Sequence, residues 1–155
     1  MQNRAESSTP IKTKGNDPWA YICWFIAALN ILNGVWMLLA PAHWYVHLPA
    51  GVPVYGPLNV HFIRDIGCTF SLLGLGLIFA GLYPLFRFPL FTMNTAFFLM
   101  HMFVHVHEMT SGRIHHSMFW TDLPAVYAPA IVFAVMNVVL FRKFRQESKT
   151  SHGRF

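Results

Sequence analysis

Residues 18–40 read PWAYICWFIAALNILNGVWMLLA, and no charged side chain occurs anywhere between Asp17 and Arg64. About 20 apolar residues, each advancing an α-helix by about 1.5 Å, are enough to cross the hydrocarbon core of a membrane. The stretch therefore predicts a transmembrane helix, and the remaining charge-free residues before Arg64 leave room for a loop and the start of a second helix.

Three more charge-free gaps of membrane-spanning size follow, separating Asp65 from Arg87, Arg87 from Glu108, and Asp122 from Arg142. Only 11% of the residues are charged, against about 25% in soluble proteins, so the chain could not cover a surface in water. The long apolar runs lack the alternation of barrel strands, and in lipid this leaves helices. The predicted fold class is all-α, an integral membrane four-helix bundle.

Prolines and glycines mark the expected ends of these helices. We expect a transmembrane domain over residues 18–141, with helices at about 19–40, 59–82, 90–109 and 123–141. Residues 1–17 form an expected disordered N-terminal tail, and residues 142–155 a basic C-terminal tail. Gly67, Ser71 and Gly74 would allow close helix packing, and Pro129 predicts a kink in the fourth helix.

Lysine and arginine are concentrated in the two tails and at Arg87 in the short second loop, whereas the third loop holds only Arg113 and the first has none. The positive-inside rule therefore predicts that both termini are cytoplasmic, in the bacterial inner membrane or another plasma membrane. Because this topology accounts for the net charge of +5, nucleic acid is not expected as a partner. The expected partners are the lipid bilayer and either further copies of the chain or a larger membrane complex.

All histidines except His152 fall on the outer side of this topology, which rests on lysine and arginine alone. Residues three or four apart share a helix face. His61 and Asp65 therefore form a stripe on the second helix, and His101, His105 and Glu108 form one on the third. Because consecutive helices run antiparallel, we expect Asp65 at the level of His105, and His61 near Glu108.

Imidazole nitrogens and carboxylate oxygens suit zinc, iron or copper, and bundles build metal sites from such ligands on facing helices. We predict a transition-metal site with a transport or redox role, and its ligands are drawn from His61, Asp65, His101, His105 and Glu108. Arg64 would be a partner of these ligands. The prediction depends on the two polar stripes facing each other.

Three other interpretations stay open. Haem b could be ligated by His61 together with His101 or His105, since histidine is a common axial ligand. Histidine and carboxylate side chains could instead relay protons. Finally, the chain could be an accessory subunit without chemistry of its own, with its histidines at interfacial depth. The sequence does not decide whether the protein is an enzyme.

Overall fold

The computed structural model of the protein describes residues 16–152, with side chains for residues 16–146. Within that range it holds helices and connecting loops but no strand. The long helices are α1 (Pro18–Leu39), α3 (Val60–Leu82), α4 (Pro84–Thr110) and α6 (Ala128–His152). The spans Pro18–Leu39, Val60–Leu82, Pro84–Thr110 and Met118–Gln146 are long and apolar enough to cross a membrane, which supports a multi-pass integral membrane protein.

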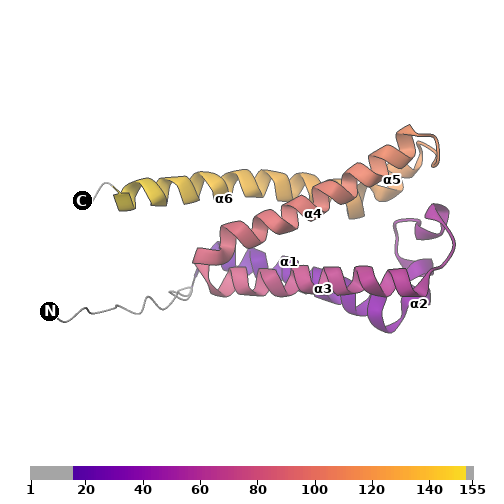
Figure 1. Ribbon diagram of the computed structural model, residues 1–155, viewed down its shortest axis with the longest axis horizontal. Coiled ribbons are helices and arrows are strands. Elements are labelled where there is room, and N and C mark those ends of the chain that lie inside the picture. Colours follow the sequence, from indigo (N-terminus) through magenta and orange to yellow (C-terminus); the bar gives the residue numbers. More distant parts are fainter. Residues whose placement is uncertain (1–15, 153–155) are drawn as a thin grey trace.

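Helix α1 packs along α3, and α4 packs against both α3 and α6 (Figure 1). The start of α1, the junction of α3 and α4 at Tyr83, and the C-terminal part of α6 lie at one end, which we call the terminal end. The short helices α2 (Pro41–His47), η1 (Val52–Tyr55) and α5 (Met118–Asp122) lie at the opposite, loop end. From their junction, α3 and α4 diverge toward the loop end (Figure 1).

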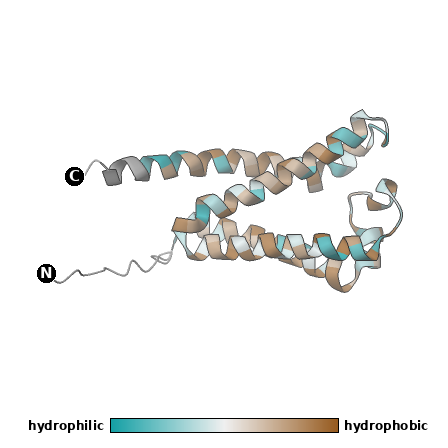
Figure 2. Cartoon of the chain, in the orientation of Figure 1, coloured by the Kyte–Doolittle hydropathy of each residue, from teal (hydrophilic) through white to brown (hydrophobic). Residues whose placement is uncertain are grey.

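Hydrophobic residues make up most of the long helices (Figure 2). Phe25, Leu32 and Leu72 have exposed fractions of 67%, 67% and 70%. Exposed side chains of this size are compatible with lipid as the surrounding solvent, because lipid tails are as apolar as leucine. The hydrophilic residues gather toward the helix ends (Figure 2).

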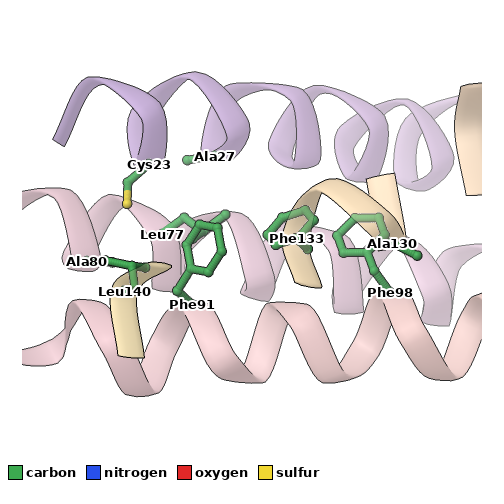
Figure 3. Packing of buried hydrophobic residues seen from close by; sticks show 9 residues of the cluster. All are labelled: Cys23, Ala27, Leu77, Ala80, Phe91, Phe98, Ala130, Phe133 and Leu140. Carbon is green, nitrogen blue, oxygen red and sulfur yellow. The ribbon is translucent and has the colours of Figure 1, made fainter. Parts of the chain in front are cut away.

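The buried apolar core receives side chains from all four long helices (Figure 3). Phe133 of α6 lies between two phenylalanines of α4, with ring centroids 5.0 Å from Phe91 and 4.6 Å from Phe98. The other residues of this cluster are Cys23, Ala27, Leu77, Ala80, Ala130 and Leu140.

Small residues bring α1 and α3 into close contact, as Gly67, Ser71 and Gly74 predicted. A Cβ atom added to Gly34 of α1 would lie 2.5 Å from Ser71 Oγ and 2.7 Å from the Gly67 carbonyl oxygen. A Cβ on Gly74 would lie 3.0 Å from the Ala27 carbonyl oxygen. We call Gly34, Gly67, Ser71 and Gly74 the small-residue seam.

The helix ends differ from the expected ones at the start of α4 and at the start of the fourth span. Helix α4 begins at Pro84 rather than near residue 90 and contains Pro89; proline is well tolerated at the first position of a helix. A π-helical turn, η2 (Leu123–Tyr127), joins α5 to α6 and ends with the Ala128 N–H donating to the Leu123 carbonyl. This irregular turn lies just before Pro129, where a kink was expected.

The expected tails are only partly described. Helix α6 continues to His152, so most of the expected basic tail is helical. Residues 1–15 of the expected N-terminal tail and residues 153–155 of the C-terminal tail lie outside the described residues.

Candidate functional site

A buried carboxylate, Asp122, lies at the loop end where α5 meets the π-helical turn η2. Its exposed fraction is 2%. Oδ2 of Asp122 lies 3.0 Å from Nδ1 of His105 on α4 and accepts a hydrogen bond from the Tyr55 hydroxyl. The other oxygen, Oδ1, is buried and has no hydrogen-bond partner among the described residues. Ionisable groups in membrane spans are costly and mark functional sites by default.

Two histidines and a tyrosine surround this carboxylate. Nδ1 of His105 lies 3.2 Å from the Tyr55 hydroxyl oxygen as well. The ring of His101, one helical turn earlier on α4, has its centroid 4.7 Å from that of His105 and stacks on Phe97. We call Tyr55, His101, His105 and Asp122 the Asp122 cluster.

The first loop places Tyr55 in this cluster through its own hydrogen bonds. The Trp44 indole N–H donates to the Asn33 side-chain oxygen over 2.9 Å, which holds α2 against α1. The Tyr45 hydroxyl donates to the Gly56 carbonyl over 2.7 Å, directly after Tyr55. Gly51 adopts a positive φ of 61° and leaves space for the Met118 side chain of α5, which a Cβ at this position would meet at 2.6 Å.

The hydroxyl of Tyr55 stays protonated in this setting. Burial raises its pKa above the ordinary value, and the hydrogen bond to Asp122 and the charge of that carboxylate raise it further. The tyrosine is therefore a fixed hydrogen-bond donor to Asp122 at neutral pH.

Two of the five predicted ligands lie elsewhere. His61 and Asp65 of α3 form an ion pair with each other, Nε2 to Oδ2, at 3.5 Å. Their side chains are 88% and 61% exposed, whereas that of His105 is 13% exposed. The expectation that Asp65 meets His105 is therefore wrong, and the two polar stripes do not face each other.

The packing of α3 explains this correction. The small-residue seam turns one face of α3 toward α1, and Phe70 contacts Phe97 and Phe98 of α4. The remaining face, which carries His61, Asp65 and Cys68, is exposed. Arg64, expected to be a partner of the predicted metal ligands, donates a hydrogen bond to the Leu38 carbonyl over 3.3 Å.

Glu108 belongs to the same helix as His105 but has another partner. Its carboxylate lies 3.9 Å from the Arg113 guanidinium. Of the predicted ligands, the structure thus brings only His101 and His105 into ring contact. Within residues 16–146, no three histidine, cysteine, aspartate or glutamate side chains form a group that could hold a metal ion.

Sequence reasoning missed Tyr55 and Asp122. Asp122 is the only acidic residue between Glu108 and Glu147 and directly precedes a predicted span, a signal that could have drawn attention to it. For Tyr55 the sequence offers no comparable signal, because it lies in a proline- and glycine-rich loop 67 residues before its partner.

Comparisons of the chain with protein-family models, curated proteins and solved structures found no match.

Proposed function

We propose that the protein is a gated proton carrier, in which the Asp122 cluster exchanges protons with the loop-end face of the membrane. The single observation that supports it most is the buried carboxylate Asp122, which is hydrogen-bonded to His105 and Tyr55 and has one oxygen with no partner in the described part of the chain. Chains of aspartate, glutamate and histidine inside membrane spans are the usual means of moving protons in pumps and transporters.

The chemistry of the pair suits proton exchange. When Asp122 is ionised it only accepts hydrogen bonds, and the proton between His105 and Asp122 then belongs to Nδ1 of the imidazole. Nε2 of the same ring then has a free lone pair that can take up a proton. The neighbouring ring of His101 makes no side-chain hydrogen bond within residues 16–146 and offers a second acceptor 4.7 Å away, centroid to centroid.

Further polar residues continue along α4 toward the terminal end. Asn94 and Thr95 are buried, and Asn94 Oδ1 has no partner among the described residues. The buried rings of Phe91 and Phe98 interrupt this line. A carrier that opens during transport therefore fits the arrangement better than an open pore.

Proton flux into liposomes tests the proposal. The purified full chain is reconstituted with an internal pH-sensitive dye, and a pH gradient is imposed while potassium and valinomycin balance the charge. We expect wild-type liposomes to acidify faster than empty ones. Asp122→Asn, which keeps the shape but cannot ionise, should lower the rate to that of empty liposomes, and His105→Gln should do the same.

Asp65→Asn is the matched control, because it makes the same chemical change at an exposed carboxylate outside the cluster. Its flux should equal that of the wild type. Equal rates in wild-type and empty liposomes would refute the proposal, as would unchanged flux in Asp122→Asn. Size-exclusion chromatography and helicity establish that each variant is folded.

The metal site expected from the sequence stays a prediction. His101 and His105 are the two predicted ligands that contact each other, and Asp122 lies within hydrogen-bond distance of His105. Elemental analysis of the sample used for the flux measurement checks it. Stoichiometric metal that is lost in a His101→Ala/His105→Ala variant would favour a metal-binding function over the proton carrier.

A further inference from the structure

A cavity of about 270 Å³ lies at the terminal end, between the start of α1, the start of α4 and the C-terminal part of α6. Its charged lining residues are Asp17, Arg87 and Lys143, and aromatic walls come from Trp19, Phe88 and Phe144. None of these residues belongs to the Asp122 cluster.

Arg87 is a buried cation at this cavity, with a side chain only 10% exposed. One Nη2–H donates to Asp17 over 2.8 Å, and Nε–H donates to the Ala80 carbonyl over 3.2 Å. A guanidinium has five N–H donors in a fork that matches phosphate oxygens. These two bonds leave guanidinium donors for an anionic ligand.

Lys143 gives the cavity lining its net positive charge. Its ammonium nitrogen lies 5.7 Å from the ring centroid of Trp19, over the ring face. Asp17 balances Arg87, so the three ionised side chains leave a net charge of +1. The cavity is therefore complementary to an anion.

The apolar walls and the location favour a lipid over a free ion. The rings of Phe88 and Phe144 stack with centroids 5.1 Å apart, which offers an apolar surface beside the charged groups. Tryptophan, lysine and arginine gather where a span meets the headgroups, and anionic lipids attract such basic segments. We propose that this cavity binds the phosphate group of an anionic phospholipid between Arg87 and Lys143, with its acyl chains along Phe88 and Phe144.

Ligand-induced stabilisation of the detergent-purified full chain tests the site. The unfolding temperature is followed while dihexanoyl phosphatidylglycerol, dihexanoyl phosphatidylcholine or inorganic phosphate is added. We expect a saturable rise with the anionic lipid, a smaller rise with the zwitterionic one, and none with phosphate. In Lys143→Gln, the half-saturating concentration of phosphatidylglycerol should increase about tenfold, because one charged hydrogen bond is lost.

Arg145→Gln is the matched control. It removes the same charge from the same helix, but Arg145 lies over Phe141 and does not line the cavity. Its half-saturating concentration should stay within twofold of the wild-type value. Equal rises with the two lipids, an equal effect of both substitutions, or a full rise with inorganic phosphate alone would each overturn the proposal.

Discussion

Asp122 is held by residues that lie 17 and 67 positions earlier in the chain, His105 and Tyr55. A carboxylate taken out of water is tolerated only when other groups replace its hydration. Here two donors converge on Oδ2, while Oδ1 has no partner among the described residues. An incompletely satisfied buried acid is costly for stability, and this is why we assign it a functional role.

The hydroxyl of Tyr55 should contribute measurably to stability. Tyr55→Phe removes one of the two donors to Asp122 and leaves the ring contact with His105, whose centroid lies 4.9 Å away. We expect the free energy of unfolding to fall by about 1–3 kcal/mol, the typical cost of leaving a buried acceptor without its donor. Unfolding by SDS in mixed micelles, followed by helicity, measures the change.

Tyr21→Phe provides the comparison for that measurement. Tyr21 is 57% exposed and contacts Trp24 by its ring, so its substitution should change the free energy of unfolding by less than about 0.5 kcal/mol. A Tyr55→Phe effect as small as that of Tyr21→Phe would contradict the role given to the hydroxyl.

At the scale of elements, the α1–α3 pair is held by backbones that approach closely. Between membrane helices no hydrophobic effect operates, because lipid is as apolar as the core, and association depends on close packing. The small-residue seam provides that packing and also sets the rotation of α3. The seam thus decides that His61 and Asp65 point away from α4.

Gly34→Val should separate α1 from α3. Its Cβ would lie 2.7 Å from the Gly67 carbonyl oxygen and 2.9 Å from the Ser71 backbone nitrogen, and neither backbone atom can move aside cheaply. We expect a loss of about 2 kcal/mol or more in the same unfolding assay, as for other overpacked cores.

Gly76→Ala, on the same α3, tests whether the effect belongs to the seam. The nearest atom to a Cβ there is Leu90 Cδ2 at 3.7 Å, an ordinary contact. Alanine is the better helix former by about 1 kcal/mol, so this variant should be as stable as the wild type or more stable. Tolerance of Gly34→Val would mean that α1 and α3 pack differently.

For the whole molecule, polar contacts at both ends of the bundle join segments that are far apart in the sequence. The Tyr55–Asp122 hydrogen bond joins the first loop to α5 at the loop end, and the Asp17–Arg87 ion pair joins the start of α1 to the start of α4 at the terminal end. Burial alone would raise the pKa of Asp17, but the hydrogen bond and charge of Arg87, together with the Trp19 N–H, hold it below its ordinary value of 3.8.

This pKa shift predicts acid sensitivity. A carboxyl whose folded pKa is depressed adds stability at pH values above its unfolded pKa, and that contribution is lost as the pH falls through the folded pKa. Between pH 6 and pH 3, the wild type should therefore lose more stability than Asp17→Asn, which has no carboxyl to protonate. Unfolding temperatures measured across this range check the difference, and parallel pH profiles for the two proteins would contradict it.

The number of candidate spanning helices and their approximate positions followed from the sequence. Each charge-free run identifies one span and prolines mark its ends, and neither signal depends on tertiary contacts. Much of the candidate site did not follow. His101 and His105 were predicted from their spacing on one helix. Tyr55 and Asp122 were not predicted, because their positions depend on the conformation of the first loop and of the π-helical turn.

Only the tertiary structure decided which helix faces meet. In a soluble protein, the periodicity of apolar residues shows which face of a helix is buried. In lipid, both the buried face and the lipid-facing side are apolar, so the periodicity no longer shows which face packs against another helix. The rotation of α3 depends instead on a few glycines that contact α1, and the divergence of α3 from α4 toward the loop end (Figure 1) separates Asp65 from His105. The sequence by itself determined a helical membrane protein with titratable groups near one face, and packing determined which of those groups share a site.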